Sequence, residues 1–163
     1  RINLVNDLIN ADVPVLYFPI EMGVENTIDR LVAIRTGYPF KDIVRIGRTR
    51  EVNNELEAGI LHEIDSLTVH PNFAIVNKAR VDMKYIKNTI KRFQSTLPGK
   101  KYCIVIFDLL LQIKEFFDDG TNMPQMIERA INKLDILAKE LNCHWIGVVQ
   151  LGRAAESDKV LFS

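Results

Sequence analysis

The chain has 163 residues, a length that fits one domain able to bury its own core without a disulfide or metal staple. Apolar residues make up 47% and charged residues 26%, which excludes a disordered tail, a collagen-like repeat and a coiled coil. Lys and Arg together number 21, as do Asp and Glu, so the formal net charge is zero. This balance argues against a protein that coats nucleic acid over its whole surface, but it permits a local basic patch.

The two cysteines, Cys103 and Cys143, each adjoin an apolar run, so we expect buried free thiols and a reducing compartment. No run approaches the roughly 18 apolar residues of a membrane span, and the first residues lack the apolar core of a signal peptide. We therefore expect a cytoplasmic protein with no membrane partner. The chain begins with Arg1 rather than Met, which we interpret as a fragment or a processed product.

Apolar runs of strand type alternate with helical patterns along the chain. The predicted elements are a strand at 15–18, helices at 26–35 and 51–67, a strand at 74–76, a helix capped by Asp82, a strand at 102–107, a helix at about 124–141 and a strand at 145–149. Leu56 and Ile64 are expected on the buried face of the second helix, and Ile131 and Leu134 on that of the last. This alternation implies a parallel sheet with helices on its faces.

Polar residues follow three of the predicted strands, at the point where each strand ends. They are Glu21, Asp108 and Gln150, and each of them closes an apolar run. Ligands of such sheets bind beyond the carboxyl ends of the strands. The three residues are therefore the candidate functional site.

Each of these residues has a functional and a structural interpretation. Asp108 ends a strand of Walker B type, where a carboxylate holds the Mg²⁺ that bridges nucleotide phosphates; alternatively, it caps the following turn. Glu21 is placed to polarise a water for attack on a γ-phosphate, or it is a carboxylate favoured by a helix dipole. Gln150 is a candidate γ-phosphate sensor, or an ordinary polar residue where a strand leaves the core.

Other chemistries find little support in the sequence. The three histidines have no partners at metal-ligand spacing, so no zinc site is expected, and no Gly-x-Ser-x-Gly nucleophile elbow is present. Lys84, Lys87, Lys91 and Arg92 form one basic face of a predicted helix. Such a face is either simply solvated or an interaction surface.

Several segments together keep the order and spacing of a known motif set. They are Val-Leu-Tyr-Phe-Pro-Ile-Glu-Met at 15–22, Arg-Leu at 30–31, Ile-Gly-Arg at 46–48, Ile-Val-Ile-Phe-Asp-Leu-Leu at 104–110, Leu-Ala-Lys-Glu-Leu-Asn at 137–142 and Val-Val-Gln-Leu-Gly-Arg at 148–153. The set resembles the motor domain of replicative hexameric helicases of the DnaB type. That family has Ser-Leu-Glu-Met, Ile-x-x-Asp-Tyr-Leu-Gln-Leu, Leu-Ala-Lys-Glu-Leu-Asn and Leu-Ser-Gln-Leu-Asn-Arg at the corresponding places.

The resemblance implies a RecA-like α/β fold, with a mainly parallel sheet and helices on both faces, in one domain over residues 1–163. It implies an ATP- and Mg²⁺-dependent DNA helicase in which Asp108 holds Mg²⁺, Glu21 orients the attacking water and Gln150 senses the γ-phosphate. Lys114 and Arg153 would contact single-stranded DNA inside a homo-hexamer. A primase or a helicase loader would be a further partner.

The sequence also departs from the family. Pro19 replaces Ser, Gln112 lies one place late, and Gly152 replaces Asn, which indicates a distant branch such as a phage or plasmid primase-helicase. The chain contains no Gly-x-x-x-x-Gly-Lys-Ser/Thr phosphate loop, which the family has just upstream of the position of Arg1. We therefore expect a motor domain incomplete at both ends, and a chain that by itself hydrolyses no ATP. The alternative is a non-catalytic RecA-like module that binds DNA or replication proteins.

Overall fold

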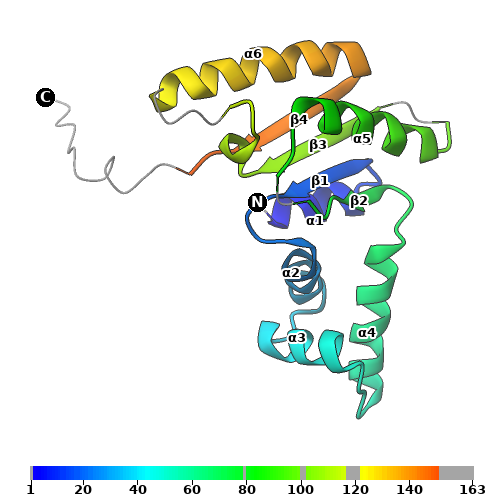
Figure 1. Ribbon diagram of the computed structural model, residues 1–163. Helices are drawn as coiled ribbons and strands as arrows, with labels where there is room; N and C mark the ends of the chain where they lie inside the picture. The colour runs from blue at the N-terminus through cyan, green and yellow to red at the C-terminus, as the bar shows by residue number, and fades with distance from the viewer. Residues whose placement is uncertain (1, 79, 100–101, 117–121, 151–163) are drawn as a thin grey trace, which may run out of the picture.

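A computed structural model describes residues 2–78, 80–99, 102–116 and 122–150, as shown in Figure 1. Helices and strands alternate along most of this part of the chain. The elements are α1 (Ile2–Asn10), β1 (Val15–Pro19), α2 (Val24–Thr36), α3 (Phe40–Thr49), α4 (Glu55–Thr68), β2 (Phe73–Ile75), α5 (Met83–Thr96), β3 (Cys103–Asp108), the 3₁₀ turn η1 (Leu110–Gln112), α6 (Met123–Leu141) and β4 (Cys143–Val148).

The four strands of the described residues form one parallel sheet in the order β2-β1-β3-β4. Its centre is β1 and β3, which lie side by side with Val15 opposite Ile104. Every residue of β1 is buried, as is usual for a central strand with helices on both faces. The predicted parallel sheet and its four strands are thus confirmed.

Helices cover both faces of the sheet, as expected. Figure 1 shows α5 and α6 together over one face, with α1 on the other. Phe18, Phe107 and Leu134 belong to the core beneath α5 and α6, whereas Tyr17 and Ile106 belong to the core on the α1 side. Helices α2, α3 and α4 form a separate group that extends this second layer away from the sheet.

Local signals set the ends of the helices. The Asp82 carboxylate accepts a hydrogen bond of 2.7 Å from the Tyr85 N–H and so begins α5, as predicted. Asn122 begins α6 in the same way, accepting from the Gln125 N–H at 3.1 Å. Helix α2 ends at Gly37, whose φ of 68° lies in the left-handed region that glycine adopts without strain.

One helix was not predicted, and three expectations about the other helices are wrong. Helix α3 has no predicted counterpart, and α4 begins at Glu55 rather than residue 51, because Asn54 accepts a hydrogen bond from the Glu57 N–H as the cap. Leu56 is 58% exposed, because the buried face of α4 runs instead through Ile60, Ile64 and Leu67. Ile131 is 40% exposed as well, since Ala130 and Leu134 take the buried positions of α6.

Among the helices that the structure describes, none combines the length and the apolar character needed to cross a membrane.

Candidate functional site

The carboxyl ends of β1, β3 and β4 meet at one edge of the sheet. Asp108 is in register with Pro19 on one side and with Val148 on the other. Glu21 follows Pro19 by two residues, and Gln150 follows Val148 by two. The three predicted residues therefore gather at the same edge, where parallel α/β sheets bind their ligands.

Asp108 is held by a contact that the sequence analysis missed. Its side chain is fully buried, and its Oδ2 accepts a hydrogen bond of 2.7 Å from the phenol of Tyr17. Tyr17 lies on the neighbouring strand, two residues before Pro19, so both side chains point to the same face of the sheet. A buried carboxylate needs such a donor, since an unpaired one is costly in the protein interior.

One signal in the sequence pointed to this contact. Tyr17 is the single polar-tipped residue in the apolar run Val15–Phe18, and a buried tyrosine hydroxyl usually finds a hydrogen-bond partner. The partner itself is 91 residues away, so the register of β1 against β3 was needed to identify it.

Glu21 lies in the turn between β1 and α2, and its side chain is exposed. Its N–H donates a backbone hydrogen bond of 3.1 Å to the Asp108 carbonyl, which fixes the turn directly against the end of β3. The turn also bonds to itself, from the Gly23 N–H to the Pro19 carbonyl at 3.1 Å. Gly23 has a φ of 75°, which suits glycine and lets α2 begin at once.

The other predicted residues lie further from this pair. Gln150 is exposed just past the end of β4. Lys114 is exposed in the turn after η1, and its N–H donates to the Val81 carbonyl at 3.1 Å, beside the start of α5. Arg153 lies outside the described residues.

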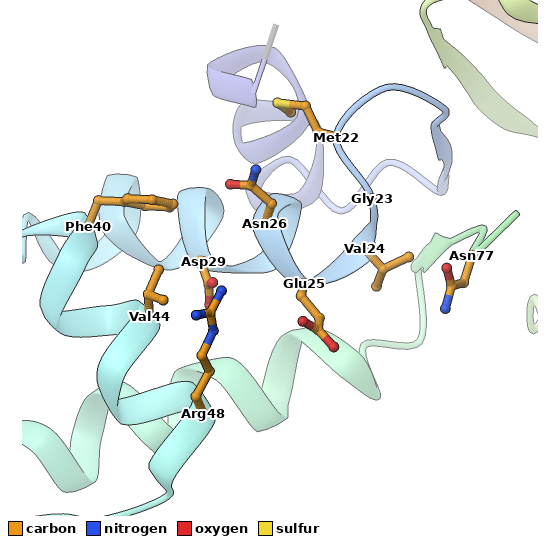
Figure 2. A pocket seen from close by; sticks show the side chains of 10 residues that line it. All are labelled: Met22, Gly23, Val24, Glu25, Asn26, Asp29, Phe40, Val44, Arg48 and Asn77. Atoms are coloured by element: carbon orange, nitrogen blue, oxygen red, sulfur yellow. The ribbon is translucent and has the colours of Figure 1, made fainter. Parts of the chain in front are cut away.

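A hollow of about 450 Å³ opens next to the Glu21 turn, between α2, α3 and the segment after β2, as Figure 2 shows. Its polar lining includes Glu25, Asp29 and Arg48. The pKa of Asp29 is raised, chiefly by burial, although the nearby Arg48 acts in the opposite direction. With two carboxyl groups against one guanidinium, and with Glu21 and Asp108 outside its lining, this hollow does not suit a triphosphate.

One residue at this edge has the kind of ligand that a magnesium site uses. Asp108 supplies a carboxylate at the end of a buried strand, and Mg²⁺ usually takes one or two carboxylates and completes its shell with water and phosphate oxygens. The described residues contain no cluster of three or more His, Cys, Asp or Glu that could hold a metal by protein ligands alone. The residues at this edge therefore suit a metal ion that arrives bound to phosphates, rather than one held by protein ligands alone. This sequence itself contains no phosphate loop to hold a nucleotide.

Comparison with known families places the chain in one of them. The model of the DnaB-like helicase C-terminal domain matches residues 1–160. The chain belongs to this family. Among curated relatives it is 28% identical, over 148 residues, to the replicative DNA helicase DnaB of Synechocystis sp.. The match covers 91% of this chain but 16% of that protein, so the chain spans about a sixth of its relative's length.

Solved structures show the same fold. One solved ATPase domain superimposes with a TM-score of 0.76 at 23% identity, covering 97% of this chain and 54% of that one. A DnaB-like replicative helicase, whose structure was described with its interactions with primase, gives a TM-score of 0.70 at 24% identity over 92% and 36% of the two chains. The predicted RecA-like α/β fold is thereby confirmed.

Proposed function

We propose that this chain forms part of an ATP-driven DNA helicase motor, which moves along single-stranded DNA and unwinds duplex during replication. The observation that supports it most directly is the joined edge, where the Glu21 turn bonds to the Asp108 carbonyl at the carboxyl ends of β1 and β3. Membership of the DnaB-like helicase family supports the same function.

Each residue of the edge has a distinct proposed role. The Asp108 carboxylate holds Mg²⁺, directly or through water, and the Tyr17 phenol holds that carboxylate in place. The exposed Glu21 carboxylate orients the water that attacks the γ-phosphate, and Gln150 senses whether that phosphate is present. Bound ATP supplies the cleavable phosphoanhydride, with Mg²⁺ neutralising its charge.

The proposed DNA path and assembly follow from the family. Lys114 and Arg153 contact the phosphate backbone of single-stranded DNA, without sequence preference, in the channel of a homo-hexamer. A related helicase was solved with its interactions with primase, so a primase, or a helicase loader, is a proposed partner of this protein too. The cytoplasm is the proposed compartment.

Replacement of Glu21 tests the motor, which we propose resides in a longer protein that also carries the phosphate loop of the family; that longer protein is the one to use. Glu21→Gln keeps the size of the side chain but removes the carboxylate, so we expect DNA-stimulated ATP hydrolysis to fall by at least about 100-fold. Nucleotide binding, measured with a fluorescent ATP analogue, should change little. Glu25→Gln, four residues further along and also exposed, is the matched control and should keep its activity.

The competing proposal is a non-catalytic RecA-like module that binds DNA or another replication protein. The altered residues after Asp108, Leu-Leu-Leu-Gln in place of Tyr-Leu-Gln-Leu, are the observation that favours it. A module of that kind would show no ATP hydrolysis above background, even with both Glu21 and Glu25 unmodified. ATPase rates at background for both the unmodified protein and Glu21→Gln would therefore favour the module over the motor, whereas equal rates above background would assign the catalytic base to another residue.

A further inference from the structure

Positive charge is concentrated in helix α5 and the segment that precedes it. Residues 78–92 contain six basic residues and one acidic residue, although the net charge of the whole chain is zero. Lys78 and Arg80 precede the helix, and Lys84, Lys87, Lys91 and Arg92 lie on it; we call these six residues the α5 basic face.

The packing of α5 turns this charge outward. Ile86, Ile90 and Phe93 fill the core beneath the helix, so the basic positions between them face away from the sheet. Lys84, Lys91 and Arg92 are exposed and form no ion pair with the described residues. Lys87 is the exception, because its Nζ lies 2.5 Å from a carboxylate oxygen of Glu140 on α6.

Two nearby carboxylates are already engaged elsewhere. Asp82 accepts from the Tyr85 N–H at 2.7 Å, and Glu115 accepts from the Met83 N–H at 3.0 Å. Both carboxylates therefore satisfy the N–H groups at the start of α5. They lie at the start of the helix rather than at its later turns, where Glu140 on α6 pairs with Lys87 and has its pKa lowered in part by the charge of Lys91.

The α5 basic face continues from the proposed DNA path. The Lys114 N–H donates to the Val81 carbonyl at 3.1 Å, so Lys114 lies directly beside the segment that contains Arg80. From there the 14 residues of α5 run for about 21 Å along the outer layer of the molecule, beside α6 in Figure 1. The result is a series of cations, interrupted where Lys87 pairs with Glu140, that begins at the carboxyl edge of the sheet.

The composition of the face identifies its partner. None of the large apolar side chains exposed on the described surface lies on α5, whereas protein interfaces are built around buried aromatic and aliphatic anchors. Cations without apolar anchors suit a phosphate backbone instead. We propose that the α5 basic face binds the backbone of single-stranded DNA, without sequence preference, as an extension of the path at Lys114. This inference rests on the proposed function through the DNA-contacting role of Lys114.

The test uses the longer protein and a fluorescent oligo(dT), with binding followed by anisotropy over a range of salt concentrations. The variant Lys84→Gln/Lys91→Gln/Arg92→Gln removes three charges from exposed positions. Each lost phosphate contact on a single strand reduces the slope of log affinity against log salt by about 0.7, so the slope should fall by about 2. We expect affinity at about 0.1 M salt to fall roughly tenfold or more.

Two further variants separate a specific site from general charge. Lys41→Gln/Lys133→Gln/Lys139→Gln removes the same charge from exposed positions on α3 and α6, and it should bind DNA like the unmodified protein. Lys84→Arg/Lys91→Arg/Arg92→Lys keeps the charge and should retain binding. An unchanged slope in the α5 variant, or an equal loss in the α3 and α6 variant, would overturn the inference. So would a loss restricted to binding of a labelled polyglutamate peptide, which would mark a protein partner instead.

The assay needs no hydrolysis, so it separates this inference from the proposed motor. A protein that hydrolyses no ATP but loses DNA affinity in the α5 variant would exclude the motor and support the α5 site. A protein that hydrolyses ATP, but whose DNA affinity is unchanged in that variant, would support the motor and exclude the α5 site.

Discussion

The hydrogen bond from Tyr17 to Asp108 joins the core of the sheet to the proposed magnesium site. Both side chains are fully or almost fully buried, so the phenol fixes one oxygen of the carboxylate where solvent cannot replace it. Partners that orient a metal-binding side chain from behind are commonly worth about 10- to 100-fold in metal affinity. In the proposed motor, Tyr17 would therefore be a positioning residue that acts through Asp108.

Tyr17→Phe removes the hydroxyl and leaves the ring in place. We expect a loss of about 1–2 kcal/mol in the free energy of unfolding, because the buried carboxylate loses the hydrogen bond from the phenol. In the longer protein with nucleotide bound, Mn²⁺ affinity measured by electron paramagnetic resonance should fall roughly tenfold. Tyr38→Phe is the control, since Tyr38 packs on the same side of the sheet without a role at the edge. Unchanged Mn²⁺ affinity in Tyr17→Phe would limit Tyr17 to a structural role.

At the scale of elements, the turn η1 lies directly on strand β4. A Cβ added at Gly147 would come within 2.8 Å of Leu110 Cδ2 and 3.1 Å of Trp145 Cζ3. Gly147 is also in register with Phe107, the residue before Asp108. The absence of a side chain at Gly147 thus lets the chain after Asp108 pack closely against the neighbouring strand.

Gly147→Ala should therefore destabilise the fold by about 1–3 kcal/mol through overpacking, measured by urea unfolding. Gly59→Ala is the matched control and should act in the opposite direction. Gly59 lies inside α4 with nothing within 4 Å of an added Cβ, so alanine should stabilise that helix by about 0.5–1 kcal/mol. In a Leu110→Ala background the cost of Gly147→Ala should shrink, which a double-mutant cycle detects. Additive costs would show that Leu110 is not the obstacle.

The sequence predicted the strands and the places of Glu21, Asp108 and Gln150 at the carboxyl ends of three of them, because both follow from local patterns. Apolar β-branched runs form buried strands, and parallel strands place their carboxyl ends together. The wrong positions have local causes too. Leu56 lies one residue from a buried position of α4, and one residue is a rotation of about 100° around a helix. The bond from Tyr17 to Asp108 depends on strand register across 91 residues, which no local pattern contains.

At the scale of the whole molecule, ionisable groups on both layers set the response of stability to pH. Glu57 has a lowered pKa, chiefly because it accepts from the Asn53 N–H and also pairs with Arg45. Hydrogen bonds from Arg50 and Lys87 lower the pKa values of Asp65 and Glu140. Since these pKa values are lower in the folded state, the stability they supply is present above the ordinary carboxyl range and is lost as pH falls through the folded values.

The buried cysteine thiols make the free energy of unfolding fall at alkaline pH as well. Burial, and to a lesser degree the neighbouring Cys143, raise the pKa of Cys103 from 9.0 to about 12. A folded pKa above the unfolded one stabilises the protein below pH 9 and ceases to do so as pH rises toward 12. The free energy of unfolding should therefore form a plateau near neutrality, falling below about pH 4.5 and above about pH 9.

Urea unfolding from about pH 3 to about pH 10.5 checks both limbs, and one variant isolates each. Glu57→Gln should be less stable than the unmodified protein at about pH 7, and this difference should shrink as pH falls below the ordinary carboxyl range, because protonation removes the same charge. Glu51→Gln, on the exposed loop before α4, should follow the unmodified protein throughout.

Cys103→Ala should flatten the alkaline limb while lowering the plateau, since it also leaves a small cavity between α5 and the sheet. An alkaline limb of unchanged slope in Cys103→Ala would assign that limb to other groups, and the buried thiol would then contribute by packing alone.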